Sequence, residues 1–426
     1  MRRFVSFGPG FVVLAAATAV LALGPAMLSR LHLATIAASV QLAQARLDGG
    51  NALEALSQAT RDVASATLPG VVHIRVRQAW GPRVIEDEDD AREPLRRFRP
   101  QASAAGWFWS EEGFIVTNAH VVQDADNLRV ELYDGRVREA RLIGADERTD
   151  IAVLKVDGAP GIVPARRATG VGVAVGERVF AFGSPFGIKF SMSQGIISGL
   201  GRSEAASLVG MSAGYTNFIQ TDAAMNPGNS GGPLVDARGR VIGMSTAIAN
   251  NVQYSGDGPP VQGQSAGIGF AIPLETIEAV VSQLIDTQLV IRGYLGITLN
   301  EYDPEEGRRI GIDYDGYGIV VTDLRAGHPA DRAGLKVNDV IIKVAGVAAT
   351  NPDVLRSLVS IRKAGEFVTI QLWRAGTLMD MDVRIGAAYF TRDGRREDLR
   401  YVPGSEDMAW DEVRRKVRSE VPERVD

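Results

Sequence analysis

The chain has 426 residues and no cysteine, with 46 Lys and Arg against 51 Asp and Glu, which gives a formal net charge of −5. This composition excludes disulfide scaffolds, thiol catalysis and cysteine-ligated metal sites. It also argues against a nucleic-acid-binding protein, because phosphate binding requires a basic surface. The 47 glycines are typical of the tight turns of all-β domains.

The N-terminal segment, residues 1–30, is predicted to be a membrane anchor or a signal segment. Arg2 and Arg3 precede an uncharged stretch that is nearly all apolar between positions 11 and 28. About 18 apolar residues approach the length that crosses a bilayer, whereas a signal peptide has an apolar core of roughly 7–15 residues. We expect a retained transmembrane helix; the alternative is a signal segment whose cleavage leaves a soluble periplasmic protein. The arginines place everything after the anchor across the membrane.

Beyond the anchor, the residue patterns divide the chain into four segments. Residues 31–68 have helical spacing and predict a short helical stalk. Residues 69–290 contain short apolar runs between Gly, Asn and Asp turns, which indicates antiparallel barrels or sandwiches. Residues 291–386 form a second β-rich unit, and residues 387–426 form a strongly charged C-terminal tail, helical near 411–421. The predicted fold class is mainly β.

A serine flanked by glycines lies in the run Gly-Asn-Ser-Gly-Gly at 228–232. Backbone that can take positive φ allows consecutive N–H groups to converge on one point, as in an oxyanion hole beside a nucleophile. The same short run also occurs as a plain turn. We predict Ser230 as the nucleophile, and the N–H groups of Gly228, Asn229 and Ser230 as oxyanion donors.

A serine nucleophile needs a base, and the pattern favours His120 with Asp150 as its partner. His120 follows an apolar strand, and Asp150 lies at the start of a buried strand. A carboxylate at that place can orient an imidazole and stabilise its charged form. The chain order His, Asp, Ser is one of the known triad orders. His73 is the competing histidine in this segment, but its alternating strand suits a structural role.

An α/β-hydrolase is excluded by the residues that follow the serine. The nucleophile elbow of that fold needs a helix directly after the serine and a histidine later in the chain. Here residues 233–243 have the pattern of strand, turn and strand. The later histidine, His328, belongs to the second β-rich unit.

Together these runs resemble the HtrA (Deg) family of trypsin-like serine proteases. The matching runs include Thr-Asn-Ala-His-Val-Val at 117–122, Arg-Thr-Asp-Ile-Ala-Val-Leu-Lys-Val at 148–156, Phe-Gly-Ser-Pro-Phe-Gly at 182–187 and Gly-Ile-Gly-Phe-Ala-Ile-Pro at 267–273. The resemblance implies a trypsin-like double β-barrel over 69–290, with the triad in the cleft between the barrels, followed by one PDZ domain. One anchor with one PDZ domain is most similar to the membrane-anchored DegS-type branch. The resemblance also implies a homotrimer, with no cofactor and no metal.

Residues 291–386 match the PDZ pattern independently. Gly-Tyr-Leu-Gly-Ile at 293–297 resembles the carboxylate-binding loop of that domain. Successive N–H groups at such a loop can capture a C-terminal carboxylate while the peptide adds as a strand. The predicted peptide-binding residues are Tyr294, Leu295, Gly296 and Ile297.

The predicted function is a serine endopeptidase of the periplasm, anchored to the inner membrane. It hydrolyses misfolded or regulatory polypeptides under the control of C-terminal peptides bound to the PDZ domain. A different class stays open, namely a PDZ scaffold or chaperone with a mostly inactive protease domain. Proteases of this fold that cleave after Lys or Arg have an Asp six residues before the serine, where this chain has Ala224. We therefore expect apolar P1 residues, and Asp222 is not expected to substitute.

Overall fold

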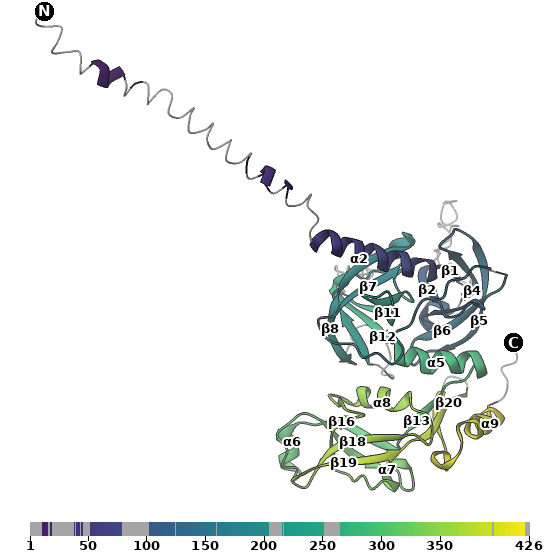
Figure 1. Cartoon of the computed structure of the whole chain (residues 1–426). Helices are drawn as coiled ribbons and strands as arrows, with labels where there is room; N and C mark the ends of the chain where they lie inside the picture. Colours follow the sequence, from purple (N-terminus) through teal and green to yellow (C-terminus); the bar gives the residue numbers. More distant parts are fainter. Residues whose placement is uncertain are drawn as a thin grey trace, which may run out of the picture. The chain divides into compact units, whose positions relative to one another are not determined.

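A computed structural model describes residues 11–15, 18, 38, 40–42, 44–45, 52–78, 102–123, 125–158, 160–203, 215, 217–250, 265–393 and 396–421. The chain divides into two units, Met1–Asp62 and Val63–Asp426. Figure 1 labels the helices and strands that are described below. Most of the predicted anchor, and most of the loop 250–265, lie outside the described residues. In the part of the chain that is described, no helix has both the length and the apolarity to cross a bilayer.

Helix α2 (Ala52–Thr67) lies inside the segment predicted as a helical stalk. A short 3₁₀ turn, Leu68–Gly70, follows it. Pro69 in this turn has no backbone N–H to donate, so the α-helix ends before it and the chain enters the first strand.

Six antiparallel strands close the first β-barrel in the order β1-β2-β3-β6-β5-β4. The strands are β1 (Val71–Gln78), β2 (Ala102–Phe108), β3 (Phe114–Thr117), β4 (Ala125–Leu132), β5 (Val137–Asp146) and β6 (Ile151–Val156). Apolar side chains that recur along each strand fill the interior, and Ile74, Val130 and Leu154 have no exposed surface. The short helix α3 (Ala119–Val122) connects β3 to β4.

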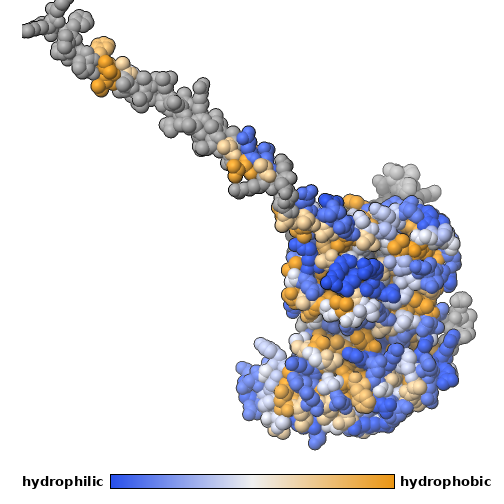
Figure 2. All heavy atoms as spheres, viewed as in Figure 1, coloured by the Kyte–Doolittle hydropathy of each residue, from blue (hydrophilic) through white to orange (hydrophobic). Residues whose placement is uncertain are grey.

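A second closed barrel has the order β10-β11-β12-β9-β8-β7. The strands are β7 (Arg178–Gly183), β8 (Ser191–Arg202), β9 (Phe218–Thr221), β10 (Pro233–Asp236), β11 (Val241–Asn250) and β12 (Ser265–Pro273). Helix α5 (Leu274–Thr287) follows β12 and buries Ile277, Val281 and Leu284 in the same core as the barrel. The predicted double β-barrel is therefore confirmed. Figure 2 shows hydrophilic and hydrophobic residues interspersed over the visible face of this region.

A six-stranded sheet with three helices follows, as expected for a PDZ domain. The strands are β14 (Ile297–Glu301), β15 (Ile319–Leu324), β16 (Val340–Val344), β17 (Val347–Ala348), β18 (Phe367–Arg374) and β19 (Thr377–Arg384). The helices are α6 (Pro304–Arg309), α7 (Pro329–Arg332) and α8 (Pro352–Ser360). The side chains of Val354, Leu355 and Leu358 on α8 belong to the core of this sheet.

The segment predicted as a charged tail is folded. Strands β20 (Gly386–Asp393) and β21 (Arg396–Val402) join β13 (Ile291–Tyr294) in a sheet of order β13-β20-β21. Helix α9 (Trp410–Glu420) follows and packs Val413 and Val417 into a small core. We call residues 386–421 the C-terminal extension. The high average charge of this segment conceals the apolar start of β20, so the strands were not predicted, whereas the helix was.

Candidate active site

Helix α3 and the start of β6 bring His120 and Asp150 together. The imidazole Nδ1 of His120 lies 2.9 Å from both carboxylate oxygens of Asp150, and the backbone N–H of His120 donates to Oδ1 at 3.0 Å. An ionised carboxylate only accepts hydrogen bonds, so Nδ1 carries the proton and Nε2 is left as the acceptor. Asn118 fixes the arrangement by donating from Nδ2 to the carbonyl of Asp150 at 3.0 Å.

The pKa of His120 is raised above its ordinary value of 6.5. Burial is the largest single influence and lowers the pKa, but the hydrogen bond to Asp150 and the negative charge of Asp150 together outweigh it. The His120 side chain is nevertheless 48 % exposed. A substrate can therefore reach the imidazole, which is held as a base by a buried carboxylate.

Strands β10 and β11 position the serine. The Oγ of Ser230 donates to the carbonyl of Thr246 at 3.4 Å, and Thr246 Oγ1 donates to Asp150 Oδ2 at 2.5 Å. Among the described residues no hydrogen bond joins Ser230 to His120. Hydrogen bonds of this kind between catalytic groups often tighten only when substrate is bound. Sequence patterns carried no signal for Thr246, because a threonine inside an apolar strand is common.

The predicted oxyanion donors behave differently from one another. Within the described chain, the N–H groups of Gly228 and Ser230 have no hydrogen-bond acceptor and are available to a ligand. The N–H of Asn229 already donates to the carbonyl of Asn226 at 2.9 Å. The inclusion of Asn229 is therefore corrected, since its donor is used inside the turn.

Gly228 occupies a position that a larger residue could not take. Its φ is 106°, and a Cβ built there would lie 2.2 Å from the carbonyl oxygen of Ser184. The backbone N–H of Ser184 in turn donates to the carbonyl of Gly228 at 3.1 Å. Only glycine combines this conformation with so close an approach, so the turn holds the Gly228 N–H in place beside the serine.

The residues before the serine contain no free carboxylate in the specificity position. Ala224 is exposed, and its carbonyl accepts a hydrogen bond from Ser193 Oγ at 2.7 Å. Asp222 points elsewhere, since its Oδ1 accepts from the backbone N–H of Ile196 on β8 at 2.7 Å. This arrangement agrees with the expectation that Asp222 does not replace the missing acid.

His73 does not join the site. It is 3 % exposed on β1, and its Nδ1 has no hydrogen-bond partner. Burial, with a smaller effect from Arg75, lowers the pKa of His73 below its ordinary value of 6.5. A buried neutral imidazole on a barrel strand fits the predicted structural role. In the described residues no group of three or more His, Asp or Glu side chains could hold a metal ion.

The predicted carboxylate-binding loop lies between β13 and β14. Gly296 has φ of 81°, and a Cβ there would lie 2.5 Å from Cβ of His328. In the described chain the N–H groups of Leu295 and Gly296 have no acceptor, while their carbonyls accept from Ala330 and Arg325 at 3.0 and 2.9 Å. The side chain of Leu295 is buried in the core of the sheet and that of Ile297 is partly exposed. Within the described chain, this loop thus has two backbone donors without an acceptor, next to the partly exposed side chain of Ile297.

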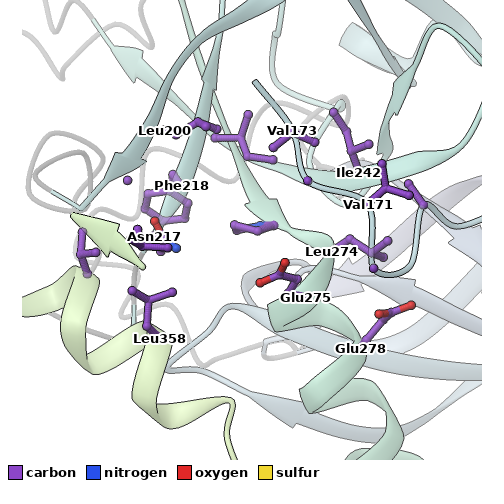
Figure 3. A pocket seen from close by; sticks show the side chains of 18 of the residues that line it. Val171, Val173, Leu200, Asn217, Phe218, Ile242, Leu274, Glu275, Glu278 and Leu358 are labelled. Carbon is purple, nitrogen blue, oxygen red and sulfur yellow. The ribbon is translucent and has the colours of Figure 1, made fainter. Parts of the chain in front are cut away.

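A separate cavity of about 390 Å³ lies between the second barrel and α8 (Figure 3). Its lining is mostly apolar, with Leu200, Phe218 and Leu358 among the residues, and Glu275 and Glu278 of α5 line one end (Figure 3). Neither His120 nor Ser230 contributes to it. The cavity is therefore distinct from the candidate active site.

Comparison with known families agrees with this geometry. Residues 104–244 match the model of the trypsin-like peptidase domain, and residues 293–385 match the model of the PDZ domain. The fold and the site thus define a trypsin-like serine protease with one PDZ domain.

Individual relatives narrow this class. The probable periplasmic serine endoprotease DegP-like of Chlamydia trachomatis serovar D is 34 % identical over 359 residues, which cover 78 % of this chain and 69 % of that protein. The protein of the same name from Brucella suis biovar 1 is 39 % identical over 372 residues, covering 76 % and 68 %. A solved structure of the HtrA-type protease AlgW with tripeptide has a TM-score of 0.56 at 33 % identity, covering 77 % of this chain and 96 % of AlgW. The chain belongs to the HtrA family, and its relatives indicate a periplasmic serine endoprotease of this type.

Proposed function

We propose that Ser230 is the nucleophile of this endopeptidase, that His120 is its general base and that Asp150 orients the imidazole. The observation that carries the proposal is the contact of His120 Nδ1 with both carboxylate oxygens of Asp150 at 2.9 Å, which leaves Nε2 free to accept a proton. The free N–H groups of Gly228 and Ser230 supply the two donors that an oxyanion needs.

The reaction follows from these positions. Ser230 Oγ bonds to the carbonyl carbon of the scissile peptide while its proton passes to Nε2 of His120. The negative charge on the former carbonyl oxygen is stabilised by the N–H groups of Gly228 and Ser230. The C–N bond then breaks, and His120 gives the proton to the leaving amine. Water repeats the sequence on the acyl-enzyme and regenerates Ser230.

The test compares Ser230→Ala with the wild-type protein in casein hydrolysis and in labelling by a fluorophosphonate probe. Loss of the nucleophile is expected to lower the rate on the order of 10⁴–10⁶-fold and to abolish labelling. Ser282→Ala, at an exposed position on α5, is the matched control and is expected to change neither readout. Equal activity of Ser230→Ala and wild type would refute the assignment.

The PDZ domain is proposed to regulate the protease by binding C-terminal peptides at Tyr294, Leu295, Gly296 and Ile297. The free N–H groups of Leu295 and Gly296 support this, because a carboxylate needs several donors at once. AlgW has been solved with a tripeptide and with a decapeptide. Peptides with free and with amidated C-termini are titrated against hydrolysis of a substrate too short to reach the PDZ domain. If the free-carboxylate peptide binds without changing the turnover of this substrate, the regulatory proposal is wrong, and the PDZ domain only tethers substrates.

A second candidate function is a PDZ scaffold or chaperone with a mostly inactive protease domain. The observation that favours it is the orientation of Ser230, whose Oγ donates to Thr246 and not to His120. The fluorophosphonate probe separates the two candidates. Absence of labelling at Ser230, even with activating peptides present, supports the scaffold, and labelling at any peptide concentration excludes a permanently inactive domain.

The N-terminal segment is proposed to anchor the protein in the inner membrane, which restricts substrates to its vicinity. The apolar run after Arg2 and Arg3 supports this. Membrane fractionation with sequencing of the mature N-terminus is the test, and a wholly soluble protein starting near Met27 would show a cleaved signal.

A homotrimer is proposed from the family resemblance, and sedimentation equilibrium of the periplasmic part measures its mass.

A further inference from the structure

The C-terminal extension is built onto the strand that leads into the predicted carboxylate-binding loop. Strand β20 pairs with β13 along all four residues of β13, the last of which is Tyr294, where the loop begins (Figure 1). The backbone N–H of Ala387 on β20 donates to Ser405 Oγ at 2.7 Å, and Ser405 has no exposed surface. The extension therefore lies next to the loop, although it follows the whole six-stranded sheet in the sequence.

Tyr401 on β21 brings an aromatic ring from the extension to the loop. Its ring stacks on that of Tyr294 with centroids 5.1 Å apart, and its centroid lies 4.3 Å from that of His328. The rings of Tyr294 and His328 are 5.6 Å apart, so each of the three rings contacts the other two. Aromatic pairs at such separations attract one another beyond the area that they bury. We call these three residues the ring cluster.

Polar contacts fix the hydroxyl end of Tyr401. Its Oη donates to Glu406 Oε2 at 2.8 Å, and the carboxylate of Glu406, which is 4 % exposed, also forms an ion pair with Arg332 of α7. Burial and the hydrogen bond to Glu406 raise the pKa of Tyr401 to about 12, so the phenol keeps its proton at neutral pH and remains a donor. The ring of Tyr401 is thus tied to α7 as well as to the extension.

His328 connects the ring cluster to the backbone of the loop. A Cβ built on Gly296 would lie 2.5 Å from Cβ of His328, so the two residues pack too closely for either to move alone. His328 belongs to residues 325–330, which we call the support turn. Within this turn the N–H of His328 donates to the carbonyl of Arg325 at 3.1 Å.

The support turn sets the direction in which the N–H groups of the loop point. The N–H of Ala330 donates to the carbonyl of Leu295 at 3.0 Å, and the N–H of Arg325 donates to the carbonyl of Gly296 at 2.9 Å. In a planar trans peptide the N–H points opposite to the C=O. The N–H of Gly296, which shares a peptide with the Leu295 carbonyl, therefore points away from the support turn, and so does that of Ile297. These are donors of the kind that a C-terminal carboxylate needs.

We infer that Tyr401 is a positioning residue for the carboxylate-binding loop, acting through His328 and the support turn on the N–H groups of the loop. The C-terminal extension is thereby part of the peptide-binding site. The inference rests on the proposed function, because it assumes that C-terminal peptides bind at this loop. Without the ring of Tyr401, His328 loses its contact on the side of the extension, and the donors are no longer held in one direction.

The test measures the Kd of labelled peptides by fluorescence anisotropy, on the full chain with Ser230→Ala so that no peptide is cleaved. A decapeptide that ends in an apolar residue is compared with the same decapeptide carrying an amidated C-terminus. In Tyr401→Ala we expect the Kd of the free-carboxylate peptide to rise roughly ten- to a hundredfold, about the factor that hydrogen bonds to a charged group supply. The Kd of the amidated peptide is expected to change less than about twofold. A folded Tyr401→Ala with an unchanged preference for the free carboxylate would overturn the inference.

Two variants at the same position separate the ring from the hydroxyl. Tyr401→Phe keeps the ring and removes only the donor to Glu406, so its Kd for the free-carboxylate peptide is expected to stay within about threefold of that of the parent chain. Tyr401→Leu keeps apolar volume without a ring and replaces the alanine variant if that variant shows no cooperative thermal transition. We expect it to lose the preference for the free carboxylate, and a leucine variant that keeps the preference would contradict the role of the ring.

Trp410→Ala is the matched control within the extension. Trp410 on α9 packs against the small core that contains Val413 and Val417. Removal of its ring is expected to lower the Tm and to leave the preference for the free carboxylate unchanged. An equal loss of preference in Trp410→Ala and Tyr401→Ala would show a general loosening of the extension and overturn the inference.

Failure of the proposed function is recognised separately. If the parent chain binds the free and the amidated peptide equally well, the proposed capture of C-terminal carboxylates at the loop fails, and the role of Tyr401 fails with it. If the parent chain prefers the free carboxylate and Tyr401→Ala prefers it to the same extent, peptide binding at the loop stands and only the role of Tyr401 is wrong.

Discussion

Thr246 Oγ1 donates a hydrogen bond to Asp150 Oδ2 at 2.5 Å, from a residue 96 positions further along the chain. The carbonyl of Thr246 accepts a hydrogen bond from Ser230 Oγ at 3.4 Å. One residue of β11 thus contacts both the carboxylate and the serine. Because Thr246 fixes one carboxylate oxygen, the direction in which Asp150 faces His120 is determined by the packing of the second barrel against the first.

Replacement of Thr246 by valine is expected to lower kcat about ten- to a hundredfold. Valine preserves the shape of the side chain but removes the donor, and a hydrogen bond to a charged group contributes about 1.5–3 kcal/mol. Thr246→Ser keeps the hydroxyl and is expected to stay near the wild-type rate. Steady-state hydrolysis of a chromogenic peptide measures both variants, and a valine variant as active as wild type would contradict the interpretation.

The pH dependence of kcat/KM is expected to report His120. The pKa of His120 is raised above 6.5, and only the neutral imidazole accepts the proton of Ser230, so activity rises with pH through a midpoint above 6.5. The same raised pKa affects stability. The ion pair between protonated His120 and Asp150 stabilises the folded protein fully below pH 6.5, and this stabilisation is lost as the pH rises through the higher pKa that His120 has in the folded state. Asp150→Asn is expected to remove the upward shift and to lower kcat by about 10⁴. A midpoint below 6.5 in wild type would show that burial, which lowers the pKa of His120, outweighs the effect of Asp150, which raises it.

Gly228→Ala is expected to lower kcat about 10²–10³-fold, the range found when an oxyanion donor is lost. The added Cβ would lie 2.2 Å from the carbonyl oxygen of Ser184, so the turn has to move and its N–H moves with it. Gly135→Ala is the control, since Gly135 also has positive φ, 86°, but no atom lies within 4 Å of the added Cβ. We expect the control to lose a little stability and no activity. Equal kcat values for the two variants would argue against Gly228 as a donor.

Cleavage-site profiling of an unfolded protein is expected to find apolar, uncharged P1 residues. Ala224 supplies no negative charge to balance Lys or Arg. In Ala224→Asp we expect cleavage after Arg and Lys to increase relative to wild type. Asp222→Asn is the control and leaves the profile unchanged, because the retained side-chain oxygen still accepts from the N–H of Ile196. A wild-type profile dominated by Lys or Arg would refute the prediction.

The C-terminal extension is expected to contribute to stability although its sequence is highly charged. Val413 on α9 has no exposed surface, so Val413→Ala leaves a cavity and is expected to lower the free energy of unfolding by about 1–3 kcal/mol. Val175→Ala, at a position that is 62 % exposed, removes the same atoms and is expected to be nearly neutral. Chemical denaturation followed by fluorescence compares the two. Equal midpoints would show that the extension does not unfold with the rest of the protein.

Local patterns in the sequence predicted short antiparallel strands and the pairing of His120 with Asp150, and the resemblance to the HtrA family supplied the double barrel and the PDZ domain. These features leave local traces, because alternating apolar residues mark barrel strands and a serine between glycines marks a turn with exposed N–H groups. The residue types that acid–base chemistry requires are few, and the chain has 4 histidines, which narrowed the candidates for the base.

Only the tertiary structure decided which groups surround those residues. Thr246 lies 96 positions along the chain from Asp150, and no local pattern indicates that their strands meet. The hydrogen bond that the Asn229 N–H donates to the carbonyl of Asn226 depends on the exact backbone conformation of one turn. The strands of the C-terminal extension were missed because the high charge of the segment conceals the apolar start of β20, which pairs with the distant strand β13. Residue periodicity indicates which side chains of one segment are buried. Hydrogen bonds and ion pairs between distant segments depend instead on which strands become neighbours in the tertiary structure, and in which register.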